Sequence, residues 1–237
     1  MTPVRFMGDS RAVLRQLPDE VKSEIGFALE RVQQGKMPVN AKPLKGIAPG
    51  VQEIKSDSKS GTFRAVYMAR FQRAVYVLHV FQKKSKWGIA TPKAEIDLVR
   101  RRLAQAVEWE AEEERSTMKK PYAQGSGNIY ADLGMGNPQE AQAKADLAHR
   151  IVDIIEGHKL TQVQAAKVLG VDQPKVSALM RGRLTDFSIE RLLRFLLLLG
   201  HDVHIAVTAR PRASRRHPTL RVHAGPGRFR VAAGGGR

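Results

Sequence analysis

The sequence predicts an α+β domain, then an all-α domain that ends in a strand, and last a disordered basic tail. Three observations lead to this prediction. Apolar residues alternate along neighbouring segments between residues 51 and 82, whereas they recur at helical spacing from residue 138 to residue 199. Between the two patterns, the stretch 116–138 is rich in Gly, Ser and Pro. The last segment, 210–237, contains eight Arg and no acidic residue, and few of its side chains can form a core.

The first domain, residues 1–107, is expected to hold a small mixed or antiparallel sheet with helices. A short strand at 3–7 precedes a helical stretch that Pro18 interrupts. Pro18 also opens the next helix, which has an acidic first turn and stops before Gly35. The apolar side of this helix carries Val21, Ile25, Leu29 and Val32.

Three strands are expected next, at 51–56, 62–70 and 74–82. Short polar turns separate them, which favours an antiparallel meander. Thr91 then caps a helix that has Pro92 at its first position. The first domain is therefore expected to run in the order strand, two helices, three strands, helix.

Residues 108–137 are interpreted as a linker to the second domain, which spans 138–209. Met118 lies in this linker after a finished domain, as the start of a second reading frame would, and this position suggests a gene fusion. The segment "DVHIAVTA" (202–209) alternates apolar and polar residues, which predicts a terminal strand. Before it, helices are expected at 138–157, 161–169, 174–181 and 188–199.

The composition points to a polyanionic partner. The formal net charge is +17, which favours nucleic acid or an anionic surface as the binding partner. No cysteine is present and the seven histidines show no HExxH spacing, so no metal or cofactor is expected. No run of about 18 apolar residues exists either. We expect a cytoplasmic protein that acts without a membrane and without a small-molecule substrate.

The stretch "LTQVQAAKVLGVDQPKVSALMRG" (160–182) has the pattern of a helix-turn-helix. Thr161 caps its first helix, Ala166 permits a close helix crossing, and Gly170 supplies a left-handed turn. The second helix then presents polar side chains that suit base edges and phosphates. The expected DNA contacts are Gln173, Lys175, Ser177 and Arg181, together with Thr161 and Gln162 at the start of the first helix. The competing interpretation is an ordinary helical hairpin whose polar residues face water.

This second domain resembles the Cro/repressor-type helix-turn-helix proteins, in particular the HigA-like antitoxins. The segments "SGNIYADLG", "LTQ…LG" and "FSIERLLRFLLLLGHDVHI" carry the resemblance, which covers residues 118 to about 209. It implies binding to operator DNA as a homodimer and repression of the protein's own gene. The edge of the predicted strand 202–209 is one surface through which such a dimer could form.

Cationic residues gather on one face of the predicted meander. Arg64 lies on the face alternate to Phe63 and Ala65, and Lys83 follows His79 and Phe81 on one face of the next strand. Lys84 points to the opposite face, and "KPLKG" adds Lys42 and Lys45 on a loop before the sheet. Fixed cations suit a phosphodiester, because they stabilise the charge that develops on phosphorus during its cleavage.

The first domain resembles the HigB-like, phage-derived branch of the RelE/ParE toxin superfamily over nearly all of residues 1–107. The segments "LKGIAPGVQEIKS", "GTFRAVYMAR", "AVYVLHVFQKKSKW" and "TPKAEIDLVRRRL" carry the resemblance. It implies a metal-independent endoribonuclease that cleaves mRNA on the ribosome, the 2′-hydroxyl attacking the adjacent phosphate. By this resemblance Arg64 and Lys83 are catalytic candidates, His79 is an acid or base candidate, and Lys42, Lys45 and Lys84 hold RNA.

Alternatives remain open at this stage. The lysines can be a solvated strand end, and His79 can be a satisfied sheet residue. No Tyr or His after the last helix matches the acid or base of better-known superfamily members, so the general base is not identified. A toxin neutralised by its tethered antitoxin is the leading hypothesis. The alternative is a non-catalytic regulator with a degenerate toxin-like domain for oligomerisation or RNA binding. In a third interpretation the Arg-rich tail is the main polyanion contact.

Overall fold

The structure is a computed structural model that describes residues 1–69, 73–83, 92–112 and 120–205. Within these residues one mixed sheet has the strand order β2-β3-β4-β5-β1-β6. Strands β3 to β5 form the expected antiparallel meander, and β2 adds a further antiparallel strand at its edge, whereas β1 pairs in parallel with β5. The strands are β1 (Val4–Met7), β2 (Ala41–Pro43), β3 (Val51–Ser58), β4 (Gly61–Met68), β5 (Val75–Lys83) and β6 (Tyr122–Gln124).

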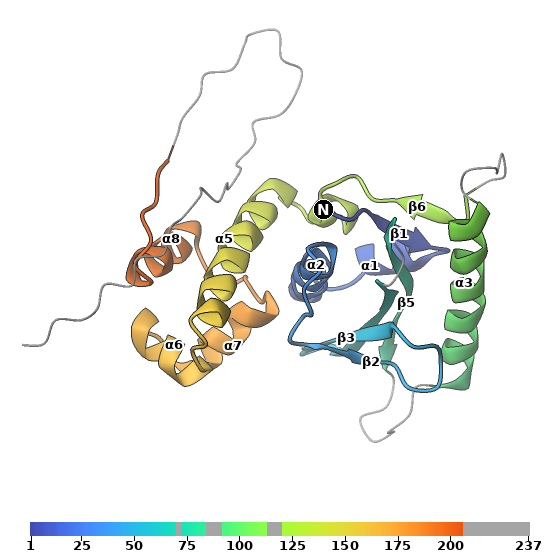
Figure 1. Ribbon diagram of the computed structural model, residues 1–237, viewed down its shortest axis with the longest axis horizontal. Coiled ribbons are helices and arrows are strands. Elements are labelled where there is room, and N and C mark those ends of the chain that lie inside the picture. The colour runs from blue at the N-terminus through green and yellow to red at the C-terminus, as the bar shows by residue number, and fades with distance from the viewer. Residues whose placement is uncertain (70–72, 84–91, 113–119, 206–237) are drawn as a thin grey trace, which may run out of the picture.

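Helices cover both faces of the sheet (Figure 1). Helices α1 (Ser10–Arg15) and α2 (Asp19–Gln33) pack on one face, and α3 (Lys93–Glu112) packs on the other. Because side chains alternate along a strand, Tyr67 of β4 joins the core beneath α2, whereas its neighbours Val66 and Met68 join the core beneath α3. We call these the α2 side and the α3 side of the sheet.

Helix α2 is buried on all sides. Its start after Pro18 and its end before Gly35, which has a φ of 76°, agree with the sequence signals. The amphipathic pattern predicts burial of one side only, yet every residue from Val21 to Val32 is buried, including Glu24, Glu30 and Arg31. The reason is visible in Figure 1: α2 lies between the sheet and the helices of the second domain.

The second domain is helical and is built from α4 (Ile129–Asp132), α5 (Pro138–Gly157), α6 (Gln162–Leu169), α7 (Gln173–Arg181) and α8 (Ile189–Leu198). Helices α5 to α8 each begin at a side chain that accepts a hydrogen bond from the backbone N–H three residues later. These N-caps are Asn137, Thr161, Asp172 and Ser188. The sequence predicts these four helices to within one or two residues.

The two domains share one continuous apolar core. Buried residues of α2 and of the α2 side of the sheet belong to the same cluster as those of α5, α7 and α8. At the junction the ring of Phe27 stacks on His149, with centroids 3.9 Å apart and planes 9° from parallel. The stretch 108–137, interpreted above as a linker, contains the last turn of α3, strand β6 and helix α4.

Some elements differ from the prediction. Strands β2 and β6 and helix α4 are short elements that the sequence pattern does not indicate. Residues 202–205 of the expected terminal strand have no strand structure, because no neighbouring strand pairs with them among the described residues. Residues 206–209 and the tail 210–237 lie outside the described part of the chain. No helix in the described part is long and apolar enough to cross a membrane.

Candidate nucleic-acid interfaces

The α3 side of the sheet carries a row of three predicted RNA-site residues, Arg64, His79 and Lys83. The register pairs Thr62 with Lys83, Arg64 with Phe81, and Val66 with His79. Because directly paired residues share a face, Arg64 and Lys83 lie on the α3 side, on adjacent strands and diagonal to each other. Lys84 falls outside the described residues.

Arg64 is tied to a buried carboxylate. Its guanidinium donates to Oε2 of Glu53 on β3 at 2.6 Å, and the Lys42 ammonium lies 3.3 Å from Oε1 of the same side chain. The side chains of Arg64 and Glu53 are 9% and 3% exposed, whereas that of Lys42 is 60% exposed. A phosphate that binds Arg64 at this position must therefore compete with Glu53.

His79 is engaged at both ring nitrogens. Nε2 lies 2.5 Å from Oε2 of Glu95 on α3, and Nδ1 lies 3.2 Å from Nη1 of Arg102. Because an arginine only donates, Nδ1 is the acceptor, and the ring proton is on Nε2 and donated to Glu95. Arg102 also donates to the Leu78 carbonyl and to Asp9. This arrangement favours the interpretation of His79 as a satisfied sheet residue, held where α3 crosses the sheet.

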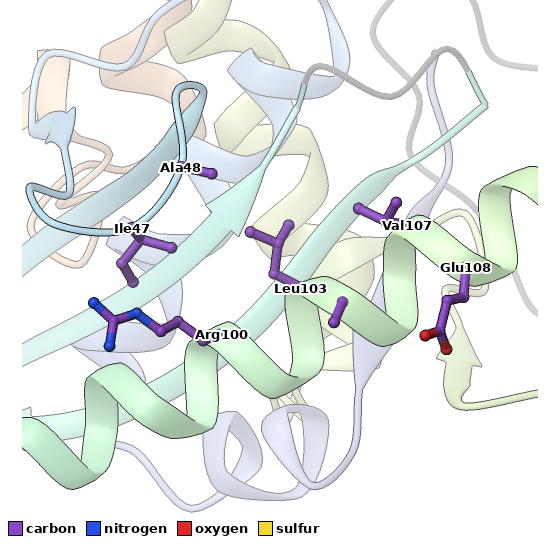
Figure 2. A pocket seen from close by; sticks show the side chains of 7 residues that line it. Ile47, Ala48, Arg100, Leu103, Val107 and Glu108 are labelled. Atoms are coloured by element: carbon purple, nitrogen blue, oxygen red, sulfur yellow. The ribbon is translucent and has the colours of Figure 1, made fainter.

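Lys45 lies apart from this row, on the loop between β2 and β3, where it is exposed. The same loop borders a groove of about 410 Å³ against α3, in which Ile47 and Ala48 face Leu103 and Val107 (Figure 2). Arg100 closes one end by donating to the Gly46 carbonyl at 2.8 Å. None of the predicted catalytic residues lines this groove.

The helix-turn-helix forms as its sequence predicts. Thr161 and Gln164 make a reciprocal capping box at the start of α6, and Gly170 ends that helix with a φ of 63°. Asp172 caps α7, and Gly182 ends it with a φ of 78°. Val176 and Leu179 anchor α7 from beneath with exposed fractions of 1% and 0%. Thr161 therefore has a structural role at the cap, besides the DNA contact expected of it.

The outer side of α7 presents the predicted DNA contacts. Gln173 and Lys175 are exposed, and Ser177 and Arg181 are half-buried. The side chain of Gln162 on α6 accepts a hydrogen bond from that of Gln173, which joins the two helices at this surface. A groove of about 250 Å³ follows the helix, lined by Gln173, Pro174, Ser177, Ala178, Arg181 and Arg183.

Several residues at these surfaces were not predicted from the sequence. Glu53, Glu95 and Arg102 hold the predicted residues of the first domain, and Arg183 lines the groove beside α7. Arg183 follows directly after the helix-ending Gly182, so its position next to the second helix of the motif was the signal that could have identified it. The three others meet their partners across the sheet, which no local pattern indicates.

Comparisons with known proteins found one similar family for each of two parts of the chain. Residues 12–104 match a family described as phage derived protein Gp49-like, and residues 129–208 match a helix-turn-helix domain family. The chain is also similar to a solved structure described as an XRE-family transcriptional regulator, with 39% identity and a TM-score of 0.36. That match covers 38% of this chain and 99% of the other. The comparison with curated proteins found no match. The chain therefore joins a segment similar to Gp49-like, phage-derived proteins to a segment similar to helix-turn-helix domains.

Proposed function

We propose that this chain is a fused toxin–antitoxin protein. In this proposal the first domain is a ribosome-dependent mRNA endoribonuclease of HigB type, and the second domain is a HigA-type partner that keeps it latent and represses its own gene. The observation that carries the proposal is the burial of the polar side of α2. Arg31, 2% exposed, donates to both carboxylate oxygens of Glu156 at 2.9 and 2.8 Å. Glu156 lies at the edge of this contact, with 41% of its side chain exposed, whereas the arginine that it pairs with is enclosed, as expected of partners that stay assembled.

The proposed catalytic face is the α3 side. Arg64 and Lys83 bind the scissile phosphate and stabilise its developing negative charge, while His79, oriented by Glu95, is the acid or base candidate. Lys42 on β2 and Lys45 on the loop after it contact the RNA next to this face, and Lys84 is proposed for the same role from its sequence position. The second domain packs on the opposite side of the sheet, so it inhibits by preventing the domain from docking on the ribosome.

The test compares residues 1–117 with the full chain in growing cells. We expect residues 1–117 to stop growth and to cleave translated mRNA, and the full chain to do neither. The matched control, Arg64→Ala with Lys83→Ala in residues 1–117, should lose about 100-fold or more of the cleavage rate, as for loss of charge-stabilising groups. Co-expression of residues 118–237 should restore growth. If soluble residues 1–117 are as harmless as their double variant, the enzyme proposal fails.

A second candidate is a DNA-binding regulator whose first domain has no catalytic activity. The bond between buried Arg64 and Glu53 favours it, because that arginine already has a carboxylate where a phosphate would bind. Both candidates include operator binding, which we propose occurs as a homodimer. Light scattering of the full chain with and without DNA would test this oligomeric state. Only mRNA cleavage by the first domain distinguishes them.

A further inference from the structure

Arg183 lies where the DNA-reading helix meets the first domain. Its Nε donates to Oε2 of Glu24 on α2 at 3.1 Å, and its Nη2 donates to the Asp57 carbonyl at the end of β3 at 2.9 Å. The side chain is 38% exposed and lines the same groove as Ser177 and Arg181. A guanidinium has five N–H groups, so these two bonds leave three to meet a ligand in that groove.

Glu24 is held rigidly by the first domain. Its side chain is 1% exposed, its Oε2 accepts the Ser56 hydroxyl at 2.7 Å, and its Oε1 accepts the Asn40 amide at 3.3 Å. Ser56 of β3 and Asn40, just before β2, hold Glu24 in place. Glu24 therefore determines where the Arg183 guanidinium lies. Two anchors on one planar group determine both its position and its orientation.

We propose that Arg183 contacts a DNA phosphate and that Glu24 and the Asp57 carbonyl of the first domain hold it in place for this contact. Arginines beside a base-reading helix commonly bind phosphate, which sets the register of the protein on DNA. A pre-oriented guanidinium loses less side-chain entropy on binding. The first domain is then part of the DNA-binding surface, a role separate from any action on RNA.

The experiment measures DNA affinity of the full chain against salt concentration, with the duplex upstream of its own gene and an unrelated duplex of equal length. We expect Arg183→Ala to weaken binding to both duplexes about tenfold, as for loss of a charge-assisted hydrogen bond. The slope of log affinity against log salt should fall by about one. Lys93→Ala removes one exposed charge from α3, on the far side of the sheet, and should leave both quantities unchanged.

Glu24→Gln tests the positioning role. As a single substitution, Glu24→Gln should weaken DNA binding several-fold. Added to Arg183→Ala, it should have no further effect, because Glu24 acts through Arg183. Burial raises the pKa of Glu24 above its usual value, despite its bonds to Ser56 and Arg183. A raised folded pKa stabilises the protein below about pH 4.5, and this stabilisation is lost as pH rises through the folded pKa. Glu24→Gln should therefore remove this pH dependence; because its amide places a donor where Glu24 has an acceptor, its DNA binding is measured at a temperature where the variant is folded.

Different results overturn the phosphate contact of Arg183, the positioning role of Glu24 and the proposed function. Unchanged affinity of Arg183→Ala overturns the phosphate contact, and equal losses from Glu24→Gln with and without Arg183 overturn the positioning role. A wild-type chain that binds neither duplex overturns the inference together with the DNA-binding assignment. Absence of mRNA cleavage by the first domain affects only the proposed function.

Discussion

Glu30→Ala is expected to lower the free energy of unfolding by about 3–5 kcal/mol, as for loss of the acceptor in a buried polar cluster. Glu30 is 3% exposed and lies on α2 at the centre of the contact between the domains. Its Oε2 lies 3.2 Å from the Tyr130 hydroxyl and 3.0 Å from Nε2 of His149, and its Oε1 accepts the Gln142 amide at 2.5 Å. Removing the carboxylate leaves these three donors without their acceptor in a closed site.

Urea unfolding followed by circular dichroism and by the fluorescence of the two tryptophans, Trp87 and Trp109, measures this effect. Circular dichroism reports mainly on the helices, whereas Trp109 lies on α3 and packs in the core between that helix and the sheet. Because one core spans both domains, we expect the two signals to change together in the wild type. Glu20→Ala, in the exposed first turn of the same helix, is the matched control. It should lower the free energy of unfolding by at most about 1 kcal/mol. Equal losses of unfolding free energy in the two variants would contradict the expected contribution of Glu30 and its three hydrogen-bond donors to stability.

The sequence pattern was sufficient where a structure depends on local signals. Periodicity and caps predicted α2, α5, α6, α7 and α8, and the alternation along β4 predicted that Arg64 lies on the face opposite Phe63 and Ala65. Burial of the polar side of α2 was not predictable in this way. Glu30 and Arg31 contact residues more than 100 positions later, and a charged helix side has the same pattern whether water or a partner covers it.

In the candidate RNA site, too, local sequence patterns did not predict the contacts between distant residues. Alternation indicated which side chains share the α3 side, but the pairings of Arg64 with Glu53 and of His79 with Glu95 depend on strand register and on where α3 crosses the sheet. A lysine or arginine in a strand looks equally available whether or not a carboxylate holds it. The number of cations on that face was therefore predictable, and their engagement with carboxylates was not.

Gly182→Ala is expected to lower the free energy of unfolding by about 2–5 kcal/mol, the sum of left-handed strain and overpacking. Gly182 has a φ of 78°, and a Cβ at this position would lie 2.2 Å from Cβ and 2.3 Å from Cγ of Phe27. Its carbonyl also accepts the Ser23 hydroxyl at 2.9 Å. Relief of the clash requires either the end of α7 or the Phe27 ring to move, and that ring stacks on His149.

Gly170→Ala is the control that isolates this contact. Gly170 ends α6 in the same left-handed conformation, with a φ of 63°, but a Cβ there meets no atom within 4 Å. Gly170→Ala should lower the free energy of unfolding only through left-handed strain, by about 1–2 kcal/mol. Because α7 carries the predicted DNA contacts, Gly182→Ala should also weaken DNA binding more than Gly170→Ala does, measured at a temperature where both variants are folded. Equal losses of stability and DNA affinity in the two variants would show that the reading helix does not depend on Phe27. A larger loss in Gly182→Ala would mean that the first domain sets the position of that helix.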